Sequence, residues 1–130
     1  MNIQKAAKWF GIVFIAIGIL GFVPGITSNG HLLGIFGVDT VHNVIHLLSG
    51  IVALLCAGSA SAAKTYFKVF GVVYGLVTIL GFMSGTSVLG IFMVNGADNV
   101  LHLLIAVIAL ALGFGGSKPM MAAPSSTQPM

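Results

Sequence analysis

Four long apolar runs constrain what this chain can fold into more than any other feature. They cover residues 6–23, 41–58, 67–83 and 97–114, and each contains 17 or 18 residues. At about 1.5 Å per residue, such a helix is roughly 27 Å long, close to a hydrocarbon core about 30 Å thick. Backbone amides in lipid must bond within the segment, and the apolar residues are continuous rather than alternating. The sequence therefore predicts an all-α integral membrane protein with four transmembrane helices.

The composition excludes an ordinary water-soluble domain. Hydrophobic residues make up 58% of the sequence and charged residues 5%, and the only acids are two aspartates. A soluble domain carries about 25% charged residues, so we expect most of the surface to face the lipid bilayer. The net charge of +3 does not indicate a nucleic-acid partner, because the basic residues are all lysines and are scattered along the chain.

The lysines predict the orientation of the helices. If all four runs span, one side of the membrane carries every lysine of the chain, namely Lys5, Lys8, Lys64, Lys68 and Lys118. The opposite loops, near residues 24–40 and 84–96, contain no lysine or arginine. Positively charged loops stay in the cytoplasm, so we expect a multi-pass protein with both termini cytoplasmic. A signal peptide is the alternative for the first run, but no small-x-small cleavage site follows it.

An internal repeat is visible in the sequence. Residues 9–25 and 69–85 are identical at eight of 17 positions, and residues 33–50 and 89–106 are identical at ten of 18. The sequence therefore predicts a duplicated two-helix unit, which also argues against a signal peptide. Because each unit has an even number of spans, both units point the same way, related by a pseudo-twofold axis along the membrane normal.

The repeat sets the domain boundaries. We expect one transmembrane domain over residues 1–116, with repeat one at 6–58 and repeat two at 66–115. An apolar LGIF segment in each repeat is expected to rest in the outer interface or to pack back onto the bundle. Residues 117–130 are rich in Pro, Ser and Ala and are predicted to form a disordered cytoplasmic tail.

Small residues recur along the predicted helices. At steps of three and four they share one helical face, where they let neighbouring backbones approach closely. On the first and third helices the stripe runs from Gly11 to Gly25 and from Gly71 to Gly85. On the second and fourth helices the predicted packing residues are Gly50, Ala53, Ala57, Ala106, Ala109 and Gly113.

The same faces of the second and fourth helices carry polar residues, which are rare inside a membrane and mark candidate sites. His42 and His46 lie four residues apart, and Asp98 and His102 occupy the equivalent places in the second repeat. If these faces meet, three imidazoles and one carboxylate form a ligand set for zinc, copper or iron near the outer face. The spacing alone leaves other roles open.

Three alternatives compete with a metal site. His46 and His102 can be axial ligands of a tetrapyrrole, although the small residues beside them favour helices too close together for a macrocycle. In a structural interpretation, the histidines and asparagines hydrogen-bond a neighbouring helix or the loop that carries LGIF, each contact contributing about 0.6–2 kcal/mol. Proton or ion translocation is the third alternative. It would need a path of polar groups across the membrane, and the helices offer few polar residues beyond the histidines.

Other polar residues take supporting roles in these interpretations. Asn43 and Asn99 are predicted to orient the metal ligands if a metal binds. His31 is expected in a loop, and Asp39 is predicted to cap the second helix. Cys56 sits within an apolar run, where it is expected to act as a small hydrophobic residue.

The paired motif resembles a known family. VHNVIHLLSG in the first half and ADNVLHLL in the second, each preceded by LGIF, resemble bacterial four-helix membrane proteins classified as domain of unknown function 4383. The resemblance extends to about Gly115, and its motif positions are occupied here by His42, Asn43, His46, Asp98, Asn99 and His102. It implies a bacterial inner (plasma) membrane protein and implies no catalytic residue.

A non-enzymatic structural or accessory subunit is the expected function, with no cofactor and with other membrane subunits or a second copy as partners. The alternative is a membrane protein that binds a metal or cofactor through the paired motif. An enzyme ranks third, because the sequence shows no nucleophile beside a base, no phosphate-binding loop and no glutamate.

Overall fold

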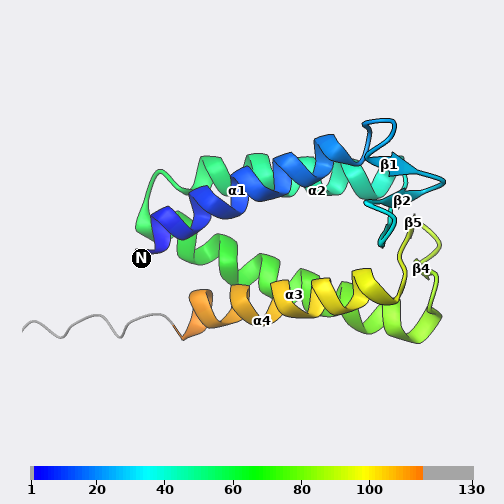
Figure 1. Cartoon of the computed structure of the whole chain (residues 1–130). Coiled ribbons are helices and arrows are strands. Elements are labelled where there is room, and N and C mark those ends of the chain that lie inside the picture. Colours follow the sequence, from blue (N-terminus) through cyan, green and yellow to red (C-terminus); the bar gives the residue numbers. More distant parts are fainter. Residues whose placement is uncertain (1, 116–130) are drawn as a thin grey trace, which may run out of the picture.

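The computed structural model describes residues 2–115. Within them lie four helices that run along one common axis (Figure 1): α1 (Ile3–Leu20), α2 (Thr40–Cys56), α3 (Ala60–Ser84) and α4 (Gly96–Phe114). Helices α1, α3 and α4 are long and apolar enough to cross a membrane, whereas α2, with 17 residues, is shorter. The predicted helical architecture is confirmed, with membrane-spanning length for three of the four helices. The predicted tail at 117–130 and Lys118 lie outside the described residues.

Local contacts explain where the helices begin and end. Asp39 caps α2 as predicted, because its Oδ1 accepts a hydrogen bond from the backbone N–H of His42 at 2.8 Å. Helix α3 starts earlier than the apolar run suggested, because the Ser59 side chain caps its first turn. It ends at Gly85, whose φ of +80° lies in the left-handed region that favours glycine.

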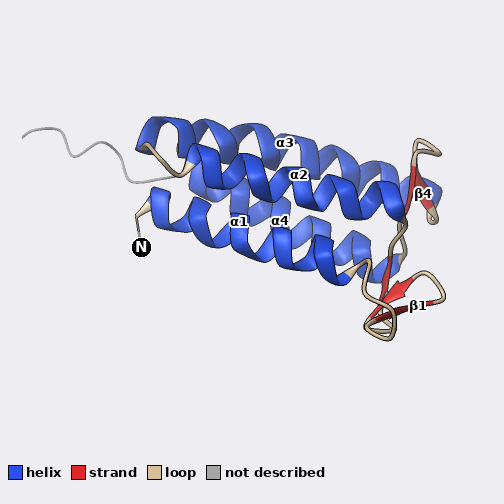
Figure 2. Cartoon of the chain, turned by 90° about the horizontal axis from the view of Figure 1, so that it is seen from above, coloured by secondary structure: helices blue, strands red, loops and turns tan. Residues whose placement is uncertain are grey.

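Short antiparallel strands, which the sequence did not predict, connect the helices at one end of the bundle (Figure 2). The apolar LGIF segments form their tight turns, in which Leu33 and Leu89 adopt positive φ values of 56° and 53°. The N-terminus lies at the opposite end (Figure 1). The strands are β1 (Thr27–Ser28), β2 (His31–Leu32), β3 (Phe36–Gly37), β4 (Ser87–Val88) and β5 (Phe92–Met93).

The helices pack mainly as two pairs, α1 with α2 and α3 with α4, and smaller contacts join α3 to α1 and α2. Glycine permits the close approach of α1 and α2: a Cβ on Gly50 would lie 2.7 Å from the backbone oxygen of Gly11. Gly25 and Gly85 do not belong to the packing stripe, contrary to the prediction. Both lie in turns with positive φ, and nothing lies within 4 Å of the place where their Cβ would be.

The interior holds small clusters of buried side chains, and the outer helix faces are apolar. Phe14, Tyr74 and Ala106 form the cluster at mid-bundle. Large apolar side chains such as Leu55 and Met83 are more than three-quarters exposed. An apolar surface of this kind suits contact with lipid.

Candidate metal centre

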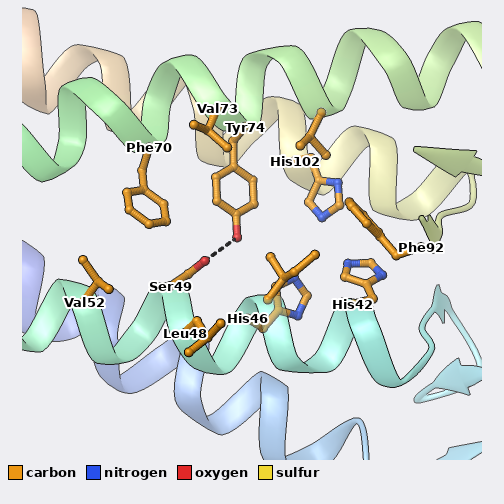
Figure 3. A pocket seen from close by; sticks show the side chains of 12 residues that line it. His42, His46, Leu48, Ser49, Val52, Phe70, Val73, Tyr74, Phe92 and His102 are labelled. Atoms are coloured by element: carbon orange, nitrogen blue, oxygen red, sulfur yellow. Dashed lines mark hydrogen bonds between the residues drawn. The ribbon is translucent and has the colours of Figure 1, made fainter. Parts of the chain in front are cut away.

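Three histidines converge near the end of the bundle that carries the short antiparallel strands, which we call the hairpin end (Figure 2). His42 and His46 project from α2 and His102 from α4, and Figure 3 shows their rings in one small region between the helices. One possible ligand nitrogen from each histidine lies within 4.8 Å of the other two, and all three side chains are buried. Zinc binds imidazole nitrogen at about 2.0–2.1 Å, which places tetrahedral ligands about 3.4 Å apart. The rings therefore need to close by no more than about 1.4 Å to share one ion.

The hydrogen bond of His42 decides which of its nitrogens is available. Its Nδ1 lies 2.9 Å from the backbone oxygen of Met93. A carbonyl oxygen only accepts, so Nδ1–H is the donor and Nε2 of the neutral ring keeps its lone pair. Metal-binding histidines are commonly oriented in this way, with the other ring N–H on a backbone carbonyl.

Three ring nitrogens in the cluster have no hydrogen-bond partner. Nε2 of His42, Nδ1 of His46 and Nδ1 of His102 are buried and unpaired within residues 2–115. Leaving a buried polar atom unpaired costs about 1–3 kcal/mol. The structural interpretation predicted that the histidines bond a neighbouring helix or the loop that carries LGIF. Of the three histidines in the cluster, His42 makes such a bond, to Met93 directly after the second LGIF segment. The three rings therefore have nitrogen atoms free to bind a ligand.

Asp98 lies outside this cluster, so the predicted four-residue ligand set reduces to three histidines. Its Oδ2 accepts a hydrogen bond from the backbone N–H of Asn95 at 2.9 Å, and Oδ1 of Asn95 accepts one from the N–H of Asp98. These reciprocal bonds form a capping box at the start of α4. The Asp98 carboxylate therefore caps the N-terminus of α4, whereas His42 at the equivalent position of α2 belongs to the cluster.

The two asparagines predicted to orient the metal ligands pack against neighbouring helices. Asn43 Nδ2 donates a hydrogen bond to the backbone oxygen of Gly21 at 3.0 Å. Asn43 also occupies the space where a Cβ on Gly21 would stand, and Asn99 occupies the same space beside Gly81. Only glycine at those two positions lets an amide side chain pack so close to the neighbouring helix.

A comparison with protein-family models decides where the chain is classified. The model described as domain of unknown function (DUF4383) matches residues 4–115. The chain belongs to this family. No curated protein and no solved structure matches it. The resemblance seen in the paired motif is confirmed for this DUF4383 protein.

Contacts between residues far apart in sequence hold the acceptor for His42 in place. Asp39 Oδ2 accepts a hydrogen bond from the backbone N–H of Met93 at 2.8 Å. Asn95 Nδ2 donates one to the backbone oxygen of Ile35 at 2.8 Å. Sequence reasoning missed Met93, because its contribution comes from the backbone and leaves no residue-type signal.

Aromatic side chains enclose the histidines in this DUF4383 member. Ring centroids lie 5.6 Å apart for Phe14 and His46, 5.1 Å for Phe92 and His42, and 5.6 Å for Tyr74 and His102. The centroids of His46 and His102 are 6.2 Å apart, and His42 packs against both. A flat macrocycle between His46 and His102 would displace His42, so the geometry favours a single ion over a tetrapyrrole.

The remaining residues singled out in the sequence are the helix-packing residues and His31. The predicted packing residues Gly50, Ala53, Ala106, Ala109 and Gly113 are buried, whereas Ala57 is half-buried and ends α2. His31 lies in β2, away from the cluster, and its Nδ1 is 2.9 Å from the backbone oxygen of Asn29.

Proposed function

We propose that this DUF4383 protein is a small integral membrane protein that binds one transition-metal ion through His42, His46 and His102. The observation that carries the proposal is the convergence of three buried imidazoles with three unpaired ring nitrogens. Imidazole is a good ligand for zinc, copper, iron and nickel. Zinc is the first candidate, because three histidines and one open position form a known zinc arrangement.

We propose a binding role without catalysis. The pocket beside the cluster also contains the hydroxyls of Ser49 and Tyr74, whose oxygens lie 3.3 Å apart. Within the described residues we find no nucleophile paired with a base. A metal-bound subunit can still associate with other membrane subunits or with a second copy through its apolar outer faces.

We further propose that α2 also spans, giving four transmembrane helices. Its 17 residues correspond to about 26 Å, and it runs beside α1 from one end of the bundle to the other (Figure 1). Lys5 and Lys64 lie near the N-terminal ends of α1 and α3, at the end of the bundle opposite to the short strands (Figure 1). The proposed topology therefore has both termini in the cytoplasm of a bacterium and the histidines near the outer face.

The duplicated unit and its parallel pseudo-twofold arrangement are also proposals. Matching contacts in the two helix pairs support them: Asn43 packs on Gly21 in the first pair, and Asn99 packs on Gly81 in the second. The motif positions diverge at one place, where His42 corresponds to Asp98. If the unit was duplicated and one copy then changed at this position, the two helix pairs would together form a single metal site.

A structural subunit without a ligand is the second candidate. The hydrogen bond from Asn43 to the backbone of Gly21 favours it, because that bond joins two helices directly. It leaves the three unpaired histidine nitrogens without a role, and for this reason we rank it second.

Metal content tests the proposal directly. The full chain is purified in mild detergent, incubated with zinc or copper, passed through a desalting column, and measured by elemental analysis and absorption spectroscopy. We expect about one ion per chain and no Soret band. The double variant His46→Asn/His102→Asn should lose the ion, because asparagine keeps hydrogen-bonding capacity but is a poor ligand for these metals.

The control variant is His31→Asn, which changes a histidine outside the cluster and should retain the ion. Binding also stabilises the fold by about 2.7 kcal/mol at a free ion concentration 100 times Kd. Chelation should therefore lower the Tm of the wild type and leave that of the double variant unchanged. A wild type that holds no stoichiometric metal, or a double variant that keeps it, would remove the proposed function.

A further inference from the structure

A cavity of about 330 Å³ adjoins the histidine cluster. The three histidines and Phe92 line one end of it, and Ser49 and Tyr74 contribute hydroxyls further along. The rest of the lining is apolar and comes from α2 and α3, as Figure 3 shows for Leu48, Val52, Phe70 and Val73. Sites for small molecules commonly have this form, with an apolar wall and a few polar groups that fix orientation.

The lining residues show where the cavity opens. Leu48 and Val52 on α2 are 56% and 39% exposed, and Val73 on α3 is 44% exposed. These side chains belong to the apolar outer surface of the bundle, which faces lipid in the proposed topology. A molecule dissolved in the bilayer can therefore reach the cavity sideways, between α2 and α3, without passing through water.

The two sides of the bundle differ in polarity at equivalent sequence positions. Ser49 and Tyr74 line the cavity, whereas the aligned residues in the other repeat are Ile105 and Phe14, which pack against the same central cluster. The hydroxyls of Ser49 and Tyr74 bond each other, which uses one of their two hydrogens. The other hydrogen remains available for a ligand on this side.

The charge balance of the metal centre favours an anion at the open position. Three neutral imidazoles add no negative charge to a divalent ion, and a buried charge is costly unless it is paired. Both acids of the chain are engaged elsewhere: Asp39 accepts from the N–H groups of His42 and Met93, and Asp98 accepts from that of Asn95. A ligand that brings its own negative charge would offset the charge of the ion.

We infer that this cavity binds a single-chain carboxylate dissolved in the membrane, such as a long-chain fatty acid. Its carboxylate ligates the ion held by the three histidines and accepts a hydrogen bond from the Ser49–Tyr74 pair. Its alkyl chain lies along the apolar wall between α2 and α3 and leads toward the lipid. The inference rests on the proposed function, because the ion supplies the positive charge.

The test uses the full chain, loaded with zinc, in phosphatidylcholine nanodiscs. Isotope-labelled dodecanoate is the probe, dodecan-1-ol is the uncharged control, and empty nanodiscs correct for partition into lipid. We expect one dodecanoate per chain, and binding at least about tenfold weaker for the alcohol and for metal-free protein, a factor equivalent to about 1.4 kcal/mol.

Two matched variants locate the binding place. Val73→Trp fills the cavity from α3 and should weaken dodecanoate binding about tenfold or more, equivalent to about 1.4 kcal/mol. Val13→Trp changes the aligned residue on α1, which is 49% exposed and is not part of the lining, and should leave binding unchanged. Zinc content reports folding in each variant. If Val73→Trp loses zinc, Val52→Trp and its aligned control Ile108→Trp make the same comparison.

The outcomes separate the two proposals. Stoichiometric zinc without bound dodecanoate overturns this inference and leaves the metal centre standing. Dodecanoate bound equally by metal-free protein, or equally weakened by Val73→Trp and Val13→Trp, also overturns it. If the wild type binds no zinc, the proposed function fails, and this inference fails with it.

Discussion

A methyl group at Gly50 has no room in the contact between α1 and α2. A Cβ there would lie 2.7 Å from the backbone oxygen of Gly11 and 2.8 Å from the backbone nitrogen of Ile15, whereas ordinary contact begins at 3.4 Å. Both neighbours are backbone atoms, so no side-chain rotation relieves the overlap. The Gly50→Ala variant must separate the helices by roughly 0.7 Å or bend one of them.

The magnitude follows from two opposing effects. Overpacking a tight contact costs about 1–3 kcal/mol. Alanine in a helix interior is better than glycine by about 0.5–1 kcal/mol. We expect Gly50→Ala to lower the free energy of unfolding by about 1 kcal/mol, within a range of about 0–2.5 kcal/mol. Gly75→Ala is the matched control, because nothing lies within 4 Å of its Cβ position in α3, and it should gain about 0.5–1 kcal/mol.

Denaturation with increasing SDS in mixed micelles, followed by circular dichroism, measures both variants in the same detergent. The difference between them isolates the packing cost, because the helix propensity gain is common to both. If Gly50→Ala is as stable as Gly75→Ala, then α1 and α2 do not approach closely enough for the Gly50–Gly11 contact. The placement of His46, one turn before Gly50 on the same helix, would then also need revision.

Two other predictions test the topology and the hairpin end. In intact cells of a Cys56→Ser background, a cysteine at Ser28 should react with an impermeant thiol reagent and one at Ser61 should not, and labelling at Ser61 would reverse the proposed orientation. Asp39→Ala should lower stability by about 1–2 kcal/mol, because the α2 cap and the bond to Met93 are both lost. Asp39→Asn keeps one acceptor and should lose less in a thermal-stability assay, and equal Tm values for the two variants would contradict this assignment.

Much of the helical framework is readable from the sequence, because its causes are local. Continuous apolar runs give the helices, and the cap at Asp39 involves a backbone group only three residues away. The small-residue stripe follows from helical periodicity, so buried positions such as Gly50 and Ala53 could be predicted. The start of α3 was less visible, because its first two turns mix alanine with Ser61, Lys64 and Thr65 and lie before the apolar run.

The tertiary structure alone decides which polar side chains meet. Helical spacing placed His42 and Asp98 on equivalent faces, yet only His42 joins the cluster, while the Asp98 carboxylate caps α4. The bond that orients His42 comes from Met93, 51 residues away, and the cavity depends on how α2 and α3 separate. Periodicity gives the face of a helix on which a residue lies, but not the rotation and separation of two helices. Those depend on tertiary packing, and for α2 and α4 they determine how close His42 and His46 come to His102.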